Sequence, residues 1–467
     1  MTAIPLTATS VASAAGGVIV AGDPGQAFDG VSVDTRTLKP GELFVAIRGD
    51  RFDGAEFAAA GIAAGAAGVL MEASRARAIA AGRAAVIAVD DSTVALQALA
   101  RAIRRASAAK VVAITGSAGK TTTKEVTSEL LSTRYRVIRN RGNFNNHIGL
   151  PLSLIDLRQR PEIAVVELGM NHAGEISTLV RIAEPEVRVW TNVGEAHLGF
   201  FASVDAIADA KAEILEGARP SDLLVANADD PRIADRIGGF AGRTTTFGLA
   251  PNAHVRAAAV VDRGIDGTSA RMTTPRGAVD VTTPLVGRGN FANILAATAV
   301  ALEFDVPLAE IAAKAATLTP AAHRGEVVRL AKGVTVIDDS YNANPTATRR
   351  ALDVLTGSQA SRRIAVIGEM LELGERSADL HAEVGRAAAN ARLDALIAVG
   401  GAPALALADA AVAAGMPAVA VRYVPTSDDA ADVAAAMLHA GDLVLVKGSR
   451  GIKTDRVVDR LKSSWGG

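Results

Sequence analysis

The stretch VVAITGSAGKTTTK at residues 111–124 constrains the fold of this chain more than any other. An apolar run leads into a Gly-Ser-Ala-Gly turn, and a lysine with three threonines then opens a helical pattern. Glycines let the backbone N–H groups converge on one point, where the positive end of the following helix also lies. The order strand, loop, helix predicts a nucleotide-binding site. Its expected residues are Gly116, Ser117, Ala118, Gly119, Lys120, Thr121 and Thr122.

Each residue type in this loop suits a nucleotide phosphate. Lys120 can reach the β- and γ-phosphates, and the Thr121 hydroxyl can bind Mg²⁺. The loop departs from the common G-x-x-x-x-G-K-[ST] motif, because Ile114 stands where the first glycine would be. A glycine turn without ligand is therefore the alternative, although the flanking strand and helix patterns favour the phosphate loop.

Composition narrows the class of protein. A chain of 467 residues exceeds one hydrophobic core and predicts two to four domains. Basic and acidic residues number 49 and 50, which argues against nucleic acid or an anionic membrane as main partner. Cysteine is absent, which excludes disulfides and a cysteine nucleophile. No basic residue precedes Arg36 and no apolar run reaches about 20 residues, so we expect a cytoplasmic protein without membrane insertion.

Strand and helix patterns alternate through three stretches, residues 1–107, 108–323 and 324–467. The first is a small α/β unit and the second opens with the phosphate loop. The third has strand patterns separated by helical ones, which is typical of a mostly parallel, Rossmann-like sheet. We therefore expect an α/β fold of three domains. The strands expected in the third are residues 334–337, 364–367, 395–399, 418–421 and 443–446.

Two further strands of the central stretch carry polar groups at or just after their ends. Glu167 lies near the end of an apolar strand at residues 163–168, and His197 follows a strand at residues 187–193. Ligands bind beyond the carboxyl ends of parallel strands, so both side chains, with Thr121, predict a metal site at one sheet edge. By itself His197 would be a capping or core histidine. Lys211 lies inside a predicted helix, where a solvated lysine is the default.

Amide-rich and basic loops add candidate contacts. GNFNNHIG at residues 142–149 offers many amide donors and acceptors, although a turn cluster is the alternative. Asn290 and Asn293 share one helix face and could read an adenine edge, whereas N-capping would explain only one of them. DDSYNANP at residues 338–345 suits hydroxyls and amines, and KGSRG at residues 447–451 suits a carboxylate.

The first stretch contains arginines that could hold a diphosphate. DTR at residues 34–36 follows a short strand pattern, and RGDR at residues 48–51 forms a polar loop. Guanidinium groups pair with phosphate through two parallel hydrogen bonds. Surface arginines in a turn are an equally good explanation of these residues alone.

Taken together, these motifs resemble the Mur ligases, the ATP-dependent amide-forming enzymes of peptidoglycan precursor synthesis, over essentially the whole chain. Within that family, TGSAGKTTTKE, GNFNNHIGLP and DDSYNANP are similar to the member that adds D-alanyl-D-alanine. The D-[ND]-P-R signature that the member adding the third amino acid carries in its last domain is absent from residues 324–467. The resemblance implies a monomeric ligase that joins D-alanyl-D-alanine to UDP-N-acetylmuramoyl-tripeptide through an acyl phosphate, using ATP and Mg²⁺.

The resemblance also implies roles for individual residues. Lys120 would hold the ATP phosphates, Thr121 and Glu167 one Mg²⁺, and His197 a second, with a carbamoylated Lys211 close to the metal. Nucleotide contacts are implied for Asn146, Asn290, Asn293, Arg324 and Asp339. Contacts with the uridine diphosphate are implied for Thr35, Arg36 and Arg48, and contacts with the muramyl peptide for Asn143 and Asn145. Tyr341, Asn342, Asn344, Lys447 and Arg450 are the candidates for the peptide and dipeptide ends.

Two other functions stay open at this point. A folylpolyglutamate synthase-like ligase shares the phosphate loop, but such synthases begin close to that loop and lack the stretch from residue 34 to residue 54. A nucleotide-binding regulatory protein without catalysis is the other alternative, and the intact Lys120, Glu167 and His197 argue against it. Since nucleotide groups come from two domains, we expect closure of the third domain to assemble the site.

Overall fold

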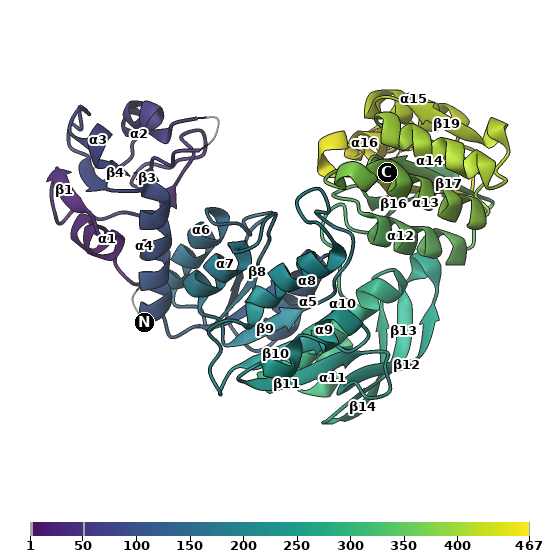
Figure 1. The fold of residues 1–467 in the computed structure, drawn as a ribbon, viewed down its shortest axis with the longest axis horizontal. Coiled ribbons are helices and arrows are strands. Elements are labelled where there is room, and N and C mark those ends of the chain that lie inside the picture. Colours follow the sequence, from purple (N-terminus) through teal and green to yellow (C-terminus); the bar gives the residue numbers. More distant parts are fainter. Residues whose placement is uncertain (1–2, 50–51, 467) are drawn as a thin grey trace. The chain divides into compact units, whose positions relative to one another are not determined.

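The computed structural model describes residues 3–49 and 52–466 (Figure 1). The chain forms two compact units and passes between them several times. One unit comprises Met1–Ile114, Arg134–Arg188 and Glu213–Asp222, and the other Thr115–Thr133, Val189–Ala212 and Leu223–Gly467. Three β-sheets with intervening helices follow one another along the described residues. The predicted α/β class is therefore confirmed, while the boundaries at residues 107 and 323 stay predictions.

The first sheet has the strand order β1-β5-β4-β3-β2. All neighbouring strands are parallel except β1, which runs antiparallel to β5. Its buried side includes Phe44, Val69 and Val86. The strands are β1 (Val18–Ala21), β2 (Val31–Ser32), β3 (Leu43–Val45), β4 (Gly68–Glu72) and β5 (Ala85–Val89). The helices are α1 (Ala8–Ala15), α2 (Ala58–Ala63), α3 (Ala73–Ala76) and α4 (Ser92–Ala106).

The second sheet has the order β14-β13-β12-β11-β10-β9-β6-β8-β7. Strands β6 and β8 are almost wholly buried runs of Val, Ile and Ala, as expected for parallel strands covered on both faces. The strands are β6 (Lys110–Thr115), β7 (Val137–Arg139), β8 (Ile163–Glu167), β9 (Val187–Trp190), β10 (Leu223–Asn227), β11 (Arg243–Gly248), β12 (Val255–Asp262), β13 (Thr268–Thr274) and β14 (Gly277–Thr283). The helices are α5 (Lys120–Leu131), α6 (Gly149–Ile155), α7 (Glu175–Ala183), α8 (Val204–Ala212), α9 (Pro231–Ala234), α10 (Gly287–Glu303) and α11 (Leu308–Ala315).

The third sheet has the order β15-β16-β20-β17-β18-β19 and is parallel except for β15, as predicted for a Rossmann-like sheet. The strands are β15 (Glu326–Arg329), β16 (Thr335–Asp339), β17 (Arg362–Gly368), β18 (Ala395–Val399), β19 (Val421–Val424) and β20 (Asp442–Lys447). The helices are α12 (Pro345–Gly357), α13 (Ser377–Asn390), α14 (Ala402–Ala413), α15 (Ser427–Met437) and α16 (Asp455–Trp465), and Figure 1 shows several of them flanking these strands.

One strand prediction in this sheet is wrong. Residues 418–421 were expected to be extended, but Ala418–Ala420 form a turn of 3₁₀-helix in which the Ala420 N–H donates to the Pro417 carbonyl. Pairing with β18 starts only at Val421, opposite Leu396. The apolar pattern is the same in both cases, and the local turn shifts the strand by three residues.

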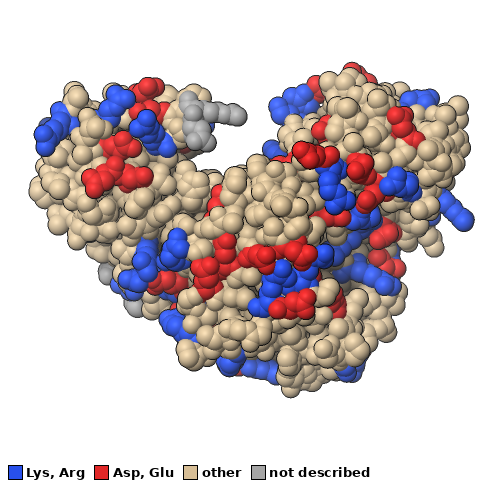
Figure 2. Space-filling view, in the orientation of Figure 1, with Lys and Arg blue, Asp and Glu red and all other residues tan. Residues whose placement is uncertain are grey.

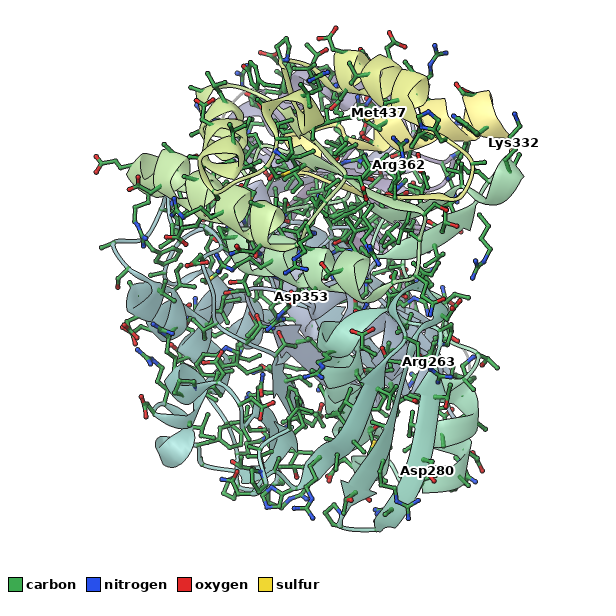
Figure 3. All side chains as sticks on the ribbon, turned by 90° about the vertical axis from the view of Figure 1, so that its right-hand side faces the viewer. Arg263, Asp280, Lys332, Asp353, Arg362 and Met437 are labelled. Carbon is green, nitrogen blue, oxygen red and sulfur yellow. The ribbon has the colours of Figure 1, made fainter. Side chains whose placement is uncertain are left out.

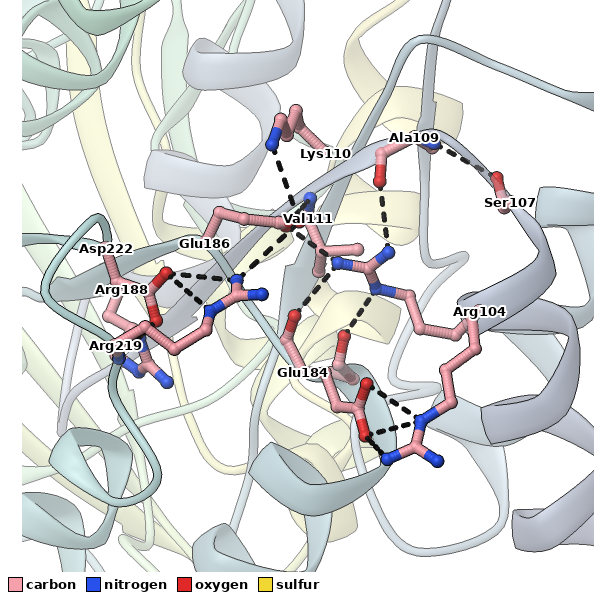
Figure 4. Close-up of polar contacts among 12 residues, drawn as sticks. Arg104, Ser107, Ala109, Lys110, Val111, Glu184, Glu186, Arg188, Arg219 and Asp222 are labelled. Carbon is pink, nitrogen blue, oxygen red and sulfur yellow. Dashed lines mark hydrogen bonds and ion pairs between the residues drawn. The ribbon is translucent and has the colours of Figure 1, made fainter.

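Buried and half-buried arginines fix the ends of several elements. Arg362 binds the Asp442 carboxylate (2.6 and 2.9 Å) and the Met437 carbonyl (2.7 Å), which ties the end of α15 to β17 and β20. Figure 3 labels Arg362 and Met437. In the other unit, Arg104 of α4 donates to the carbonyls of Ala183 and Glu184 at the end of α7 (Figure 4). These contacts satisfy carbonyls that a helix end leaves without a partner.

The ion pair of Arg188 and Asp222 in Figure 4 is fully buried. Arg188 Nη1 lies 2.8 Å from Asp222 Oδ2, and each side chain is at most 2% exposed.

On the face drawn in Figure 2, basic and acidic side chains are interspersed, in keeping with the balanced composition. No helix within the described residues is long and apolar enough to cross a membrane.

Candidate functional site

The phosphate loop lies between β6 and α5, as predicted, and two glycines shape it. Gly116 has φ 152° and Gly119 has φ 80°, the conformations that side chains disfavour. A Cβ on Gly119 would collide with Asn293 Oδ1, and a Cβ on Gly116 would collide with Thr191 Oγ1. The loop therefore needs glycine at both positions for conformation and for space.

The residues after β9 hold this loop, a role that sequence reasoning missed. Asn192 accepts from the N–H of Ser117 through its carbonyl and from the N–H of Ala118 through Oδ1, both at 2.9 Å. Asn192 Nδ2 and Thr191 Oγ1 both donate to the Ala118 carbonyl (2.9 and 2.8 Å). The signal was present, because Thr191 and Asn192 follow the apolar strand directly. The amides of Ser117 and Ala118 are thus used to shape the loop.

Lys120 and Thr121 open α5 beside the loop. Lys120 Nζ donates to the Gly116 carbonyl over 2.7 Å, so the ammonium already lies across the loop. Thr121 is half-buried and Thr122 is buried. Three of the phosphate-binding features expected from the sequence, the glycine turn, the lysine and the helix N-terminus, are therefore brought together here.

Glu167 occupies the end of β8, in the other unit, and is 4% exposed. Asn145 Nδ2 donates to Glu167 Oε1 over 2.8 Å. Asn140 holds the Glu167 backbone, with Oδ1 accepting from its N–H (3.0 Å) and Nδ2 donating to its carbonyl (3.3 Å). The buried carboxylate is thereby positioned by amides, and the contribution of Asn140 was not anticipated from the sequence.

The register of β6 and β8 also bears on Glu167. These strands are parallel, Ile114 is opposite Glu167, and the Leu168 N–H donates to the Ile114 carbonyl over 2.8 Å. Ile114 is two residues before Gly116 in the chain. Glu167 consequently ends its strand opposite the last residues of β6, at the edge where parallel sheets bind ligands.

The asparagine loop itself has mixed roles. Asn146 Oδ1 accepts from the N–H groups of Ile148 and Gly149 (3.2 and 2.8 Å), which holds the turn that leads into α6. The Asn143 side chain is exposed, and its carbonyl accepts from the Asn145 N–H. The turn-cluster interpretation is thus correct for part of the loop, while the nucleotide and peptide roles predicted for it stay predictions.

His197 follows β9 and meets a carboxylate that the sequence did not reveal. Its Nδ1 lies 2.7 Å from Glu372 Oε2. Burial lowers the pKa of His197, the charges of Lys120 and Lys211 lower it further, and Glu372 acts in the opposite direction. The hydrogen bond with His197 lowers the pKa of Glu372, and Lys120 adds to that shift. These four charged or titratable groups therefore lie within electrostatic reach of one another.

Lys211 is not on a solvated face of its helix. The solvated face is the default for a lysine inside a helix, whereas the resemblance implies a Lys211 close to a metal; Lys211 of α8 is only 1% exposed. Its charge lowers the pKa of His197, so the buried side chain lies within electrostatic reach of that imidazole. Burial of an ammonium is costly unless it is paired or converted to another form. The solvated-helix interpretation of Lys211 is wrong.

Asn290 and Asn293 lie one turn apart on α10. Asn293 Nδ2 donates to Asn290 Oδ1 (3.3 Å), and Asn290 Nδ2 donates to the Val286 carbonyl (2.9 Å). Asn293 is buried against Gly119. The structure thus gives Asn293 a place at the phosphate loop, and the adenine contact expected of both residues stays a prediction.

The candidates at the end of β16 form one polar cluster. Lys447 Nζ binds Asp339 Oδ2 (2.6 Å) and the Asn342 carbonyl (3.0 Å), and Lys447 is 2% exposed. The Arg324 guanidinium stacks on the Tyr341 ring at 4.2 Å from its centre, and Arg450 lies 5.8 Å from it. Lys447 is therefore paired inside the protein. His323, next to Arg324 in the chain, has φ 60°, and its Nδ1 lies 2.8 Å from Asp338 Oδ2.

Asn344 has a structural function in addition to the one predicted. Its Oδ1 accepts from the Ala347 N–H over 2.8 Å, and Pro345 occupies the first turn of α12. Thr346 and Arg349 of the same helix reach Glu195 Oε2 at 3.3 and 2.9 Å. The asparagine is thus an N-cap that directs α12 toward the loop after β9.

The candidate residues for uridine diphosphate binding follow β2 and β3, and none of them is fully buried. Arg36 pairs with Asp34 at 2.6 Å, and this hydrogen bonding lowers the pKa of Asp34 to about 2. Thr35 is half-buried, and Arg48 is exposed, with its backbone paired to that of Asp53 in an isolated antiparallel β-bridge. Asp50 and Arg51 of the predicted polar loop lie outside the described residues. The uridine diphosphate contacts stay predictions.

A metal site was expected from Thr121, Glu167 and His197. Among the described residues, no three His, Cys, Asp or Glu side chains lie close enough to hold a metal ion. The expected set contains a hydroxyl, and its buried carboxylate is held in place by an amide. Hydroxyl and carboxylate oxygens suit Mg²⁺, whereas an imidazole is a less usual ligand for it. The metal set stays a prediction.

Three family descriptions match this chain. They are "Mur ligase family, catalytic domain" over residues 27–129, "Mur ligase middle domain" over residues 114–301, and "Mur ligase, glutamate ligase domain" over residues 323–450. A protein of Bacillus subtilis (strain 168) named UDP-N-acetylmuramoyl-tripeptide–D-alanyl-D-alanine ligase is 33% identical over 436 residues, which cover 93% of each chain.

Solved structures agree in fold. One described as MurF from Acinetobacter baumannii has a TM-score of 0.89 and 31% identity, and the match covers 99% of this chain and 100% of that one. Another, of MurF ligase from Thermotoga maritima in complex with ADP, has a TM-score of 0.81 and 28% identity, covering 93% and 97% of the two chains.

Proposed function

The chain belongs to the Mur ligase family of ATP-dependent amide ligases, and from this premise we propose that it joins D-alanyl-D-alanine to UDP-N-acetylmuramoyl-tripeptide. The family resemblance read from the sequence is confirmed. The folylpolyglutamate synthase alternative is set aside, because the B. subtilis relative is similar over 93% of both chains and a Mur ligase family description matches residues 27–129.

The observation that carries the proposal is the phosphate loop. Gly116 and Gly119 have positive φ angles, and a Cβ at either position would collide with a neighbouring side chain. Lys120 lies across the loop that they form. A cradle of this kind, at the start of a helix, suits the phosphates of a nucleotide. The binding of ADP by the T. maritima MurF ligase supports ATP as the phosphoryl donor.

The reaction needs two steps. A carboxylate oxygen of the tripeptide attacks the γ-phosphorus of ATP, so that an acyl phosphate forms and ADP leaves. The amine of D-alanyl-D-alanine then attacks the carbonyl carbon, loses a proton, and inorganic phosphate leaves. Lys120 stabilises negative charge on the transferred phosphoryl group. No side-chain nucleophile takes part, which is consistent with a chain that contains no cysteine.

Mg²⁺ belongs to this proposal as well. Thr121 and Glu167 would hold one ion and His197 a second, and the ions would offset charge on the phosphates. Two features of the chain support these roles. Asn145 and Asn140 fix the Glu167 carboxylate and backbone. The His197 ring has a lowered pKa, which favours the neutral imidazole that metals bind.

We include a carbamate on Lys211 in the proposal. The unprotonated Lys211 amine would attack CO₂, form an N–C bond and lose a proton, giving an anion with carboxylate-like oxygens. Burial of Lys211 and the proximity of its charge to His197 support this, because a cation there would repel a metal ion.

The remaining roles complete the proposed substrate path. Thr35, Arg36 and Arg48 would contact the uridine diphosphate, and Tyr341, Arg324 and Arg450 the nucleotide and peptide ends. Lys447 would act by ordering the loop that carries Asp339 and Asn342, which it binds directly. We propose a cytoplasmic location, since the implied substrates are cytoplasmic precursors. We also propose that the protein is a monomer, as the family resemblance implies.

A phosphate-release assay tests the function. The purified protein is incubated with ATP, Mg²⁺ and UDP-N-acetylmuramoyl-tripeptide, with and without D-alanyl-D-alanine. We expect sustained release of phosphate only when all components are present, and a pentapeptide product by mass spectrometry. Release that requires a free diamino acid and ignores D-alanyl-D-alanine would contradict the substrate assignment. No release with any acceptor would favour the regulatory alternative.

A further inference from the structure

Glu372 makes a contact that neither the sequence motifs nor the proposed mechanism explains. It lies in the segment between β17 and α13, 175 residues after His197, and its Oε2 is 2.7 Å from His197 Nδ1. The Glu372 side chain is 44% exposed and that of His197 is 19% exposed. The pair is therefore partly exposed and does not lie in a hydrophobic core, and the charge of Lys120 at the phosphate loop acts on both side chains.

The backbone around the pair is built for close approach. The Gly199 N–H donates to the Glu372 carbonyl over 2.7 Å. A Cβ on Gly374 would lie 2.9 Å from Gly199 Cα, so two glycines permit the two segments to touch. His197 and Glu372 have φ 66° and φ 65°, conformations that residues with side chains adopt rarely and keep only where the surroundings impose them.

The segment that carries Glu372 is also anchored on its own side. The Met370 N–H donates to His381 Nε2 over 2.8 Å, and the Leu371 N–H donates to Ser449 Oγ over 2.9 Å. His381 is buried, and its Nδ1 donates to the Ser377 carbonyl. The carboxylate is therefore delivered to His197 by an ordered support, which is the requirement for a group that orients another.

We propose that Glu372 is a positioning residue that holds the His197 imidazole in the tautomer protonated at Nδ1, and so keeps Nε2 as the nitrogen with the free lone pair. An ionised carboxylate only accepts hydrogen bonds, so the proton of this contact belongs to the ring. Carboxylates that bind the far nitrogen of a metal-ligating histidine set its tautomer and raise its basicity. In so far as His197 holds a metal, the inference rests on the proposed function.

The pairing also makes the tautomer of His197 depend on the contact between two segments of the chain. His197 follows a strand of the second sheet, whereas Glu372 follows a strand of the third. The tautomer is consequently selected only while these segments touch, and it would be released when they separate. Thr346 and Arg349, which reach Glu195 two residues before His197, form a second contact between the same two parts.

Nuclear magnetic resonance of ¹⁵N-histidine-labelled protein tests the tautomer directly, without nucleotide or metal. The chain has seven histidines, and the His197→Gln variant assigns the signal. We expect Nδ1–H in the wild type. In Glu372→Ala we expect a mixture with Nε2–H, and in the isosteric Glu372→Gln a smaller shift in the same direction. Glu375→Ala, which removes an exposed carboxylate of the same segment, is the matched control and should resemble the wild type.

Kinetics provide the second measurement. The Mg²⁺ concentration required for half-maximal phosphate release should rise about 10- to 100-fold in Glu372→Ala. The same change in a His197→Gln background should add nothing further, because both substitutions act through one imidazole. An unchanged tautomer in folded Glu372→Ala, or fully additive losses in the double variant, would overturn the inference. The tautomer measurement needs no ligase activity, so it stands even if the proposed substrates prove wrong.

Discussion

Asn145 donates from Nδ2 to Glu167 Oε1 over 2.8 Å, and this contact gives a buried strand-end carboxylate one defined orientation. Gly169 leaves the space for it, because a Cβ there would lie 2.8 Å from Asn145 Cγ. Asn145, for which the family resemblance implies a contact with the muramyl peptide, therefore orients the expected metal ligand. A residue that orients a ligand is as consequential for a metal site as the ligand itself.

Replacing Asn145 should accordingly impair catalysis more than stability. In Asn145→Ala, Glu167 keeps its backbone contacts with Asn140 but loses the amide donor to its side chain. We expect about a 10- to 100-fold loss of phosphate release, with a raised Mg²⁺ requirement. Arg141→Ala, an exposed change in the same loop, is the control. Wild-type kinetics in folded Asn145→Ala would show that this hydrogen bond has no functional role.

Gly119 and Gly174 offer a matched test of the phosphate loop. Both precede a helix with nearly equal φ, 80° and 86°, but only a Cβ on Gly119 meets Asn293. Alanine should cost about 1–2 kcal/mol of stability at either position because of φ. Thermal unfolding measures the backbone strain, which both variants share, and ATP titration measures the effect of the collision with Asn293, which only Gly119→Ala has. We expect Gly119→Ala to lose nucleotide affinity and Gly174→Ala to keep it, and equal affinity in both variants would refute the cradle.

Lys120 should matter through its charge. Lys120→Ala removes the ammonium that lies across the loop without opening a core cavity. We expect a loss of about 10²-fold or more in turnover with an unchanged unfolding temperature. Lys110→Ala, at the exposed start of β6, serves as the comparison. Near-normal turnover of Lys120→Ala would remove the basis for assigning ATP to this loop.

Lys211 tests the carbamate chemically. Lys211→Ala should be nearly inactive, and short carboxylic acids such as acetate should partly restore turnover by supplying the missing oxygens. Lys211→Arg should be inactive with or without acetate, since a guanidinium forms no carbamate. Acetate should not rescue Lys120→Ala, which is the control for unspecific activation. If Lys211→Arg turned over like the wild type, a positive charge would suffice and the carbamate would have to be abandoned.

His381 predicts a pH dependence of stability. Burial lowers the pKa of His381, opposed by the Ser377 carbonyl and Glu369, and its Nε2 must stay unprotonated to accept from Met370. The unfolded chain then binds more protons than the folded one below about pH 6.5. This contribution is complete above that pH and is lost as the pH falls through the folded value.

Calorimetry between pH 5 and pH 8 measures that contribution. Relative to wild type, His381→Gln should have a flatter dependence of the unfolding temperature on pH, because an amide oxygen can accept from Met370 without titrating. His197 also has a lowered pKa and contributes with the same sign, so the comparison is made on the difference between the two proteins. Parallel curves for both proteins would exclude His381 as a source of the pH dependence.

Features that depend on neighbours in the chain were predictable from the sequence. The Gly-Ser-Ala-Gly turn, Lys120 at the start of a helix, and Glu167 at the end of a strand all follow from spacing and periodicity. Most strands of the third sheet were placed correctly for the same reason, while the shift at residues 418–421 came from one local turn. The family resemblance added roles that spacing alone could not assign.

The sequence by itself therefore determined the α/β class and the order of strand, glycine turn and helix at the phosphate loop, since both are properties of short segments. Only the tertiary structure decided that Asn192 shapes the loop, that Lys211 is buried, and that Glu372 binds His197. These contacts join residues that are far apart in the chain, and each depends on how strands and helices pack. A surface carboxylate such as Glu372 has no local pattern that distinguishes it from its neighbours, and the packing of Gly199 against Gly374 gives it its partner.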